Sequence, residues 1–289
     1  MTAREGAPTL APVGRDDVEE VAAFLNEHLN SRVSAEKWSA MIVPPWLCDA
    51  PNHGYLLRTD DGLVGVHLAF YSTRLVEGRP QQFCNLSAWC VLEPYRAHGL
   101  RLLRALLAQP GYTFTDLSPS GNVIEVNRRL RFRELDTATA LVPNLPWPLF
   151  SRRARISLDP AVLSRTLTGL DHDVHADHAN SLAVRHLLLQ ADGEHCYVMV
   201  RRDRRRGLPI FATVLYVGNP TLFARHGRVV FRHLLGRGAL ATLAELRVVG
   251  SRPALSRMLA APRPKMFLST ALDGDDIDYM YSELACVAW

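Results

Sequence analysis

The sequence predicts an α/β protein built from two similar domains. The chain of 289 residues is 48% hydrophobic and 21% charged, which is sufficient for two compact cores. Residues 83–132 follow the order strand, basic turn, helix, strand and helix, and residues 195–249 follow a weaker version of that order. The proline-rich segment 143–148 interrupts regular structure between them. We therefore predict one domain over residues 1–148 and a second over residues 149–289.

The first half of the chain alternates short apolar segments with amphipathic segments. Strands are predicted at residues 9–13, 55–59, 63–71 and 82–91, and helices at residues 18–29 and 35–41. Asp16 or Asp17 is suited to cap the first helix, because a carboxylate accepts hydrogen bonds from unpaired helix N–H groups. The sequence Asp60-Asp61-Gly62 predicts a hairpin turn between the second and third strands.

The second half repeats this order in a weaker form. Segments 195–203 and 209–217 predict a hairpin around the arginine-rich turn 204–207. The helix-like segment His98–Leu107 can be aligned with His226–Leu235, and a strand-like segment precedes and follows each of them. Because the flanking elements agree as well, we interpret the chain as a duplication with a degenerate second copy.

A candidate ligand site lies where the strand at 82–91 meets the helix that follows it. The strand ends near Val91, and a turn with the basic residues Arg96 and His98 leads to Gly99 and the helix. N–H groups at the start of a helix lack partners within it, and the helix dipole favours negative charge there. The pattern therefore predicts a site for a phosphate-bearing ligand.

These residues resemble motif A of the GCN5-related N-acetyltransferase (GNAT) superfamily. The resemblance rests on Val91, Pro94, Arg96 and Gly99, whereas Arg101 stands where the family usually has a small residue. It continues into a second family block and covers the chain from about residue 9 to about residue 141. In that block Asn122, Leu130 and Phe132 fit the family pattern, while Asn127 replaces a frequent Tyr and Arg131 replaces a usual Gly.

The resemblance implies that each domain has a mixed, mostly antiparallel sheet with flanking helices and a splayed central strand. It also implies that acetyl-CoA or another acyl-CoA is a substrate, and that the helices at 18–41 form one wall of the acceptor site. In the family, the splayed strand binds the pantetheine arm and the turn binds the pyrophosphate. The residues implied for CoA binding are Val91, Arg96, Ala97, His98, Gly99, Leu100, Arg101 and Asn122. The second domain has only the turn Asn219-Pro220-Thr221, where proline removes one N–H group.

Acyl transfer to an amine requires the amine to lose a proton before it attacks the thioester, and a thiolate to leave. Asp116 at a strand end and Glu93 beside the turn are the candidate bases. Asn127 cannot donate a proton as the family's Tyr does, so the acid is dispensable or comes from elsewhere. The candidates for orienting the acceptor are Asn85, Ser87 and Ser118. For all of these polar residues, and above all for Asn122, backbone capping is an alternative role.

The predicted activity is transfer of an acetyl or other short acyl group from CoA to an amine of a small molecule. Two alternatives stay open. One is a module that binds acyl-CoA without turnover, and the other is a GNAT-fold enzyme of altered chemistry, such as O-acyl or S-acyl transfer or decarboxylation. If neither Asp116 nor Glu93 is the base, the acidic segment 273–278 and Glu283 are the next candidates.

Composition argues against other classes of partner. The net charge is +4 and the arginines are spread over both halves, so we expect no nucleic-acid ligand. No apolar run is long enough to span a membrane, and residues 1–17 lack an apolar signal core, so we expect a cytoplasmic protein with no membrane partner. Asp171–His178 carries three histidines, but the third leaves the helix face shared by the first two, so no metal site is predicted. Homodimer formation is left open.

Overall fold

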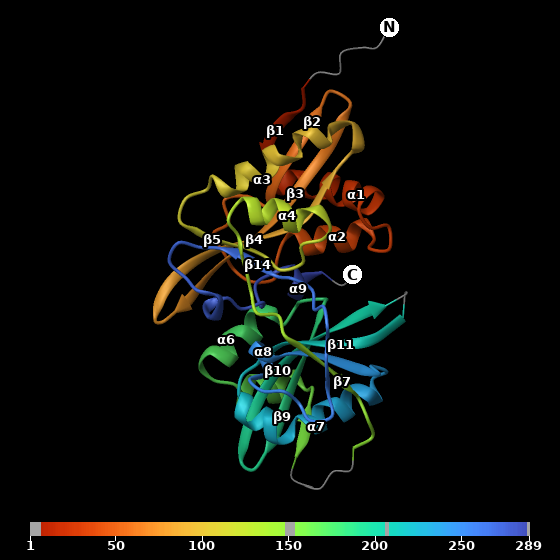
Figure 1. Cartoon of the computed structure of the whole chain (residues 1–289), viewed down its shortest axis with the longest axis vertical. Helices are drawn as coiled ribbons and strands as arrows, with labels where there is room; N and C mark the ends of the chain where they lie inside the picture. Colours follow the sequence, from red (N-terminus) through yellow and green to blue (C-terminus); the bar gives the residue numbers. More distant parts are fainter. Residues whose placement is uncertain (1–6, 148–153, 206–207, 288–289) are drawn as a thin grey trace. The chain divides into compact units, whose positions relative to one another are not determined.

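The computed structural model describes residues 7–147, 154–205 and 208–287 (Figure 1). The chain divides into two compact units. The first comprises the residues up to Arg133 together with Met266–Asp276 and Tyr281–Glu283, and the second comprises Glu134–Lys265, Ile277–Met280 and the residues from Leu284 onward. Each unit contains its own sheet and helices, so the predicted α/β class with two domains is confirmed.

The first unit is built on a mixed sheet with the strand order β1-β2-β3-β4-β5-β14-β6. Its strands are β1 (Thr9–Pro12), β2 (Gly54–Thr59), β3 (Gly62–Val76), β4 (Arg79–Val91), β5 (Tyr112–Asp116), β14 (Met266–Leu268) and β6 (Arg133–Glu134). Its helices are η1 (Arg15–Asp17), α1 (Val18–His28), α2 (Ala35–Ile42), η2 (Glu93–His98), α3 (Gly99–Leu107), α4 (Asn122–Arg129) and η3 (Gly274–Asp276). The pairs β1–β2, β2–β3 and β3–β4 are antiparallel, whereas β4 and β5 pair in parallel.

The predicted strands and helices of this unit are present, with two differences. Strands β3 and β4 are longer than expected, because the hairpin between them turns only at Glu77 and Gly78, which both have positive φ angles. Asp17 does not cap α1 with its side chain. Its carboxylate instead accepts a hydrogen bond from the Gly14 N–H group at 2.8 Å, just before η1.

Part of the core of the first unit lies between the sheet and α3. Successive strand residues point to opposite faces, so alternate residues of β3, β4 and β5 share the face that α3 covers. The buried cluster on this face comprises Ala69, Tyr71, Cys84, Leu86, Leu103, Leu106, Phe114, Phe132 and Met266. The packing orients α3 so that its first residue, Gly99, directly follows η2 at the end of β4.

The second unit has the strand order β13-β7-β12-β11-β10-β9-β8. Its strands are β7 (Thr139–Pro143), β8 (Arg155–Ser157), β9 (Val184–Ala191), β10 (Glu194–Arg205), β11 (Leu208–Val217), β12 (Ala241–Glu245) and β13 (Arg257–Met258). The remaining helices are α5 (Pro160–Thr166), α6 (Gly169–His178), α7 (Pro220–Gly236), α8 (Leu246–Val249) and α9 (Glu283–Cys286). Within the described ranges, no helix combines the length and apolar character needed to cross a membrane.

The two units share their central topology. In each, one strand pairs in parallel with the next, β4 with β5 and β11 with β12, and a helix makes the crossover. The first strand of each parallel pair also has an antiparallel neighbour, which is β3 for β4 and β10 for β11. The register of this antiparallel pairing shifts beyond the residues that pair in parallel. The aligned helical segments differ in position, however, because His98 precedes α3 whereas His226 lies inside α7, which already begins at Pro220.

The units exchange strands. In Figure 1 the blue strand β14, from late in the sequence, lies beside β5 of the first sheet, while β7, from the first half, belongs to the second sheet. The division therefore differs from the predicted ranges 1–148 and 149–289. The proline-rich segment follows β7 rather than joining two domains, and Asn144 is fixed in the second unit by bonds to Ala239 O at 2.9 Å and Thr242 Oγ1 at 2.8 Å.

The exchange predicts that β14 contributes to the stability of the first unit. Met266 is fully buried in the core of that unit. We expect Met266→Ala to lower the free energy of unfolding by about 2–4 kcal/mol, because the lost side chain leaves a cavity. Urea unfolding followed by circular dichroism measures the change. The matched control is Leu170→Ala in α6, where the side chain is exposed and the change should stay within about 0.5 kcal/mol. Equal effects of the two substitutions would contradict the assignment of β14 to the core.

Candidate functional site

The central feature of the first unit is the separation of β4 from β5. The two strands pair from Gln82 with Tyr112 to Asn85 with Thr115. Beyond that point β5 ends at Asp116, whereas β4 continues to Val91. A register shift against β3 and the positive φ of Ala88 mark a bulge in the separated part of β4. The predicted splayed strand is therefore present, and its backbone is not paired with β5 beyond Asn85.

The predicted phosphate turn has a more regular conformation than we expected. Residues Glu93–His98 form η2, which leads directly into α3 at Gly99. Two N–H groups of this turn already have backbone acceptors, since Tyr95 donates to Leu92 O at 2.9 Å and Gly99 donates to Arg96 O. The Gly99 N–H group is therefore already used inside the predicted turn, and the binding of a phosphate by this turn stays a prediction. An anion there would depend more on the positive side chains and the helix dipole.

Three of the residues implied for CoA binding occupy defined positions in this region. Gly99 is buried, and a Cβ atom added to it would lie 3.5 Å from Val91 Cγ2 and 3.7 Å from the Trp89 ring. Its missing side chain therefore leaves room for β4 rather than for a ligand. The Arg101 guanidinium donates to Pro8 O at 2.7 Å, which directs it toward the segment before β1.

The other implied residues lie on the exposed side of the same region. Arg96, Ala97 and Leu100 are exposed, and His98 is half-buried. Asn122 is exposed at the first position of α4, whose N-cap is Gly121 without a side-chain hydrogen bond. The alternative role of Asn122 as a helix cap is therefore wrong.

Asp116 is buried at the end of β5, where the strands separate. The Asn127 Nδ2 group, from α4, donates to Asp116 Oδ2 at 2.8 Å. Burial raises the pKa of Asp116 to about 7, the hydrogen bond from Asn127 opposes this rise, and the negative charge of Glu283 adds to it. A carboxyl group with a pKa near neutrality exchanges protons readily at neutral pH.

A second polar group lies at the last paired residues of β4 and β5. The Thr115 hydroxyl donates to Asn85 Oδ1 at 3.0 Å, and Asn85 Nδ2 donates to Glu283 Oε2. Glu283 is fully buried and belongs to the first unit, although it comes from the C-terminal part of the sequence. The structure thus brings Asp116, Asn85 and the fallback candidate Glu283 to the start of the splay.

Glu93 does not join these residues. Its side chain is 83% exposed on η2, and one carboxylate oxygen lies 3.7 Å from Arg96 Nη1.

Ser87 lies on the separated part of β4 with a buried hydroxyl that has no hydrogen-bond partner among the described residues. Ser118 is half-buried just beyond β5.

The second unit carries a carboxylate at the position that corresponds to the turn. Strand β11 ends at Val217, and Asn219 caps α7 by accepting a hydrogen bond from the Leu222 N–H group at 2.9 Å. A Cβ atom on Gly218 would clash with the Asp171 carboxylate, which also accepts a hydrogen bond from Tyr216. A negative charge so close to the helix start disfavours a phosphate there.

The histidines of α6 have structural contacts. The two ring nitrogens of His178 lie 2.8 and 2.7 Å from the carbonyl oxygens of Val174 and Met280. No group of three His, Cys, Asp or Glu side chains in the described part of the chain is arranged to hold a metal ion.

Comparisons with known proteins identify the fold. No protein-family model and no curated protein matches the sequence. Among solved structures, the chain is similar to a GCN5-related N-acetyltransferase from Anabaena variabilis, with a TM-score of 0.59 and 9% identity over 90% of this chain and 72% of that one. It is also similar to a GCN5-related N-acetyltransferase from Kribbella flavida, with a TM-score of 0.52 and 15% identity over 92% and 72% of the chains.

A third similar structure is Saccharomyces cerevisiae N-myristoyltransferase with bound myristoyl-CoA. It gives a TM-score of 0.53 and 11% identity over 91% of this chain and 78% of that one. The chain therefore has the GNAT fold, present twice, and the predicted resemblance is confirmed at the level of the fold.

The site predicts two opposite shifts in the pKa of Asp116. Replacing Asn127 by Leu removes a donor to the carboxylate and should raise this pKa further above its ordinary value. Replacing Glu283 by Gln removes a negative charge and should lower it. Carbon-13 NMR titration of the aspartate carboxyl groups, with thermal melts to confirm folding, measures both shifts. Shifts of the same sign in the two variants would contradict this arrangement.

Proposed function

We propose that this protein is an acyl-CoA-dependent N-acyltransferase that transfers an acetyl group to an amine of a small molecule. The observation that carries the proposal is the Asp116 carboxyl group, buried at the point where β4 and β5 separate in a GNAT fold. A pKa of about 7 suits this group to accept a proton from an ammonium or amine at neutral pH.

The separated part of β4 offers the acyl donor a place to bind. Backbone groups of β4 beyond Asn85 have no partner in β5, so the amide groups of a pantetheine arm can pair with them as a strand would. The pyrophosphate then lies near η2 and the start of α3, where Arg96 and His98 supply positive charge. This placement brings the thioester toward the end of β5 and Asp116.

The reaction then needs one proton acceptor. The ionised Asp116 takes a proton from the attacking amine, the nitrogen forms a bond to the acyl carbon, and the carbon–sulfur bond breaks to release the thiolate of CoA. The proton on Asp116 can pass to that thiolate, which restores the carboxylate. Because a thiolate is a good leaving group, Asn127 need not replace the acid that the family's Tyr provides. Its role is to hold the Asp116 carboxyl in position through the 2.8 Å hydrogen bond.

The length of the acyl chain is tested with a panel of donors. One structural neighbour was solved with bound myristoyl-CoA, so the panel includes acetyl-, butyryl- and myristoyl-CoA. Release of free CoA is measured by chromatography, without an acceptor and with a panel of small amines, alcohols and thiols, because an added thiol would itself react with a thiol reagent. Release accelerated by amines supports the proposal. Tight binding of acyl-CoA without accelerated release would identify a binding module, and preference for an alcohol or a thiol would identify altered chemistry.

The carboxylate roles predict different effects of two substitutions. We expect Asp116→Asn to lower kcat/KM by about 10²–10⁴-fold, because the amide cannot accept the proton. The loss should be greatest below the pKa of the amine acceptor, where the acceptor arrives protonated. Glu93→Gln should retain most activity, since its side chain is exposed and its carboxylate lies near Arg96. A pH–rate profile for both variants provides the measurement, and a larger loss in Glu93→Gln would transfer the role of base to Glu93.

The donor site predicts a defect in binding when Gly99 is enlarged. The two methyl groups of Val in Gly99→Val would press on Val91 and Trp89, and so displace β4 from the start of α3. We expect CoA affinity to fall by more than about ten-fold, which corresponds to roughly 1.4 kcal/mol. Isothermal titration calorimetry with CoA measures this. Ala108→Val at the exposed end of the same helix is the matched control, and unchanged affinity in Gly99→Val would exclude this position from the donor site.

A further inference from the structure

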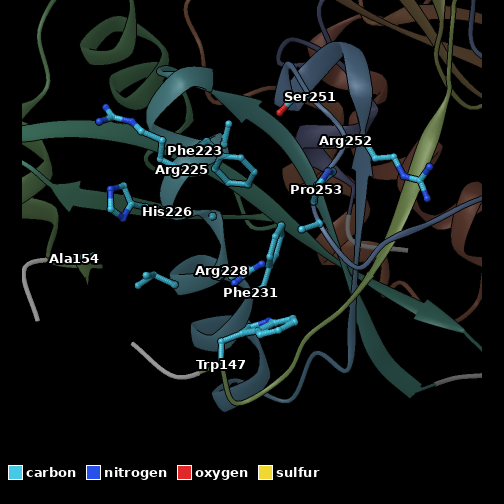
Figure 2. Close-up of a pocket in the computed structure, with 14 residues that line it drawn as sticks. Trp147, Ala154, Phe223, Arg225, His226, Arg228, Phe231, Ser251, Arg252 and Pro253 are labelled. Carbon is cyan, nitrogen blue, oxygen red and sulfur yellow. The ribbon is translucent and has the colours of Figure 1, made fainter. Parts of the chain in front are cut away.

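The second unit contains a cavity of about 430 Å³ that the proposed acyl transfer does not use (Figure 2). It lies along the middle of α7, from Phe223 to Phe231, and against the segment Ser251–Ala254 that follows α8. Trp147 and Ala154 complete its wall. This volume lies within the range of small-molecule sites in proteins.

The ionisable side chains that line the cavity are all basic among the described residues. Four of the described residues around the cavity are basic and none is acidic. Two of the four are already neutralised from outside the cavity. Arg225 pairs with Glu194 at 2.8 Å and with Asp192 at 3.5 Å, and His226 Nε2 lies 2.7 Å from Asp192.

The other two basic residues have no such counter-charge. Arg228 lies over the Trp147 ring with its guanidinium carbon 5.0 Å from the ring centre, and Arg252 donates to the carbonyl of Ser256 at 2.8 Å. Neither is paired with a carboxylate in the part of the chain that the structure describes. An anion in the cavity would therefore meet positive charge that is not already neutralised.

Aromatic rings form the apolar part of the lining. Phe223 and Phe231 are buried and pack edge to face, with ring centres 5.8 Å apart. Figure 2 shows these two rings and the Trp147 ring following one another along the cavity, with Arg228 beside Phe231. Trp147 is held on α7 by Arg232, which donates to Trp147 O at 2.7 Å.

The Trp147 ring has a polar group that no described residue satisfies. Its Nε1 atom is buried and has no hydrogen-bond partner among the described residues. A buried donor without an acceptor is unfavourable, and an acceptor atom of a ligand would satisfy it. The cation–π contact with Arg228 explains the position of the ring but not the unpaired N–H group.

We propose that this cavity binds a nucleoside monophosphate or an aromatic phosphate of that size, with the ring against Trp147 and the phosphate at Arg228. Planar rings stack on aromatic side chains, and the arginine fork matches phosphate oxygens. Arg252 adds positive charge at the rim. The site differs from the proposed phosphate turn of the first unit, because the cavity lies along the middle of α7 and the Asp171 carboxylate lies near the start of that helix.

The test is calorimetric titration of the full chain with AMP in the absence of CoA, because CoA carries a nucleotide of its own and would compete for the cavity. Adenosine and inorganic phosphate are titrated separately. We expect AMP to bind more tightly than either, because each supplies only one of the two recognised groups, and to bind more weakly as salt concentration rises. No binding of AMP to the full chain would overturn the proposal and would leave acyl transfer by the first unit unaffected.

The variants use two exposed arginines of the same helix. Arg228→Gln removes an unneutralised charge and should weaken AMP binding by about ten-fold or more. Arg225→Gln removes a charge already paired with Asp192 and Glu194, and should change the affinity by less than about three-fold. Trp147→Phe keeps an aromatic ring of smaller size and removes the N–H group, and should also weaken binding. Equal affinities of AMP for wild type, Arg228→Gln and Trp147→Phe would overturn the proposal.

Discussion

Backbone pairing between β14 and β5 is the interaction on which the rest of the first unit depends. Asp116 is opposite Met266 in this antiparallel pair, so the strand from the C-terminal part of the sequence fixes the backbone of the candidate base. On its other edge β5 pairs with β4 only as far as Thr115. Asp116 is therefore held on one side and open to the splay on the other, which is the geometry that a base beside a strand-like ligand requires.

The same arrangement balances opposing electrostatic effects. Burial and the charge of Glu283 favour the neutral form of Asp116, whereas Asn127 favours the ionised form. Because the folded-state pKa of about 7 is above the ordinary 3.8, protonation stabilises the fold at low pH, and this contribution is lost as pH rises between these values. A carboxyl group that lowers stability at neutral pH is typical of functional sites.

The sequence predicted those elements that depend on residues close together in the chain. The strand ending at Val91, the helix starting at Gly99 and the repeated order in the second half follow from periodicity and turn residues. Non-local pairings were not predictable in this way. Glu283 and Asn85 are 198 positions apart, and a three-residue strand such as β14 has too little pattern to reveal its partner. The proline-rich segment was misinterpreted because prolines end a strand and mark a linker in the same way.

Exchange of β7 and β14 also governs the order in which the chain can fold during synthesis. Domains generally fold from the N-terminus as they leave the ribosome. Here the edge of β5 has no partner until Met266–Leu268 has been made, and Asn85 has no carboxylate partner until Glu283 has been made. The chain must therefore emerge as far as Glu283 before the first unit is complete, and the edge of β5 is open to association with other chains until β14 has been made.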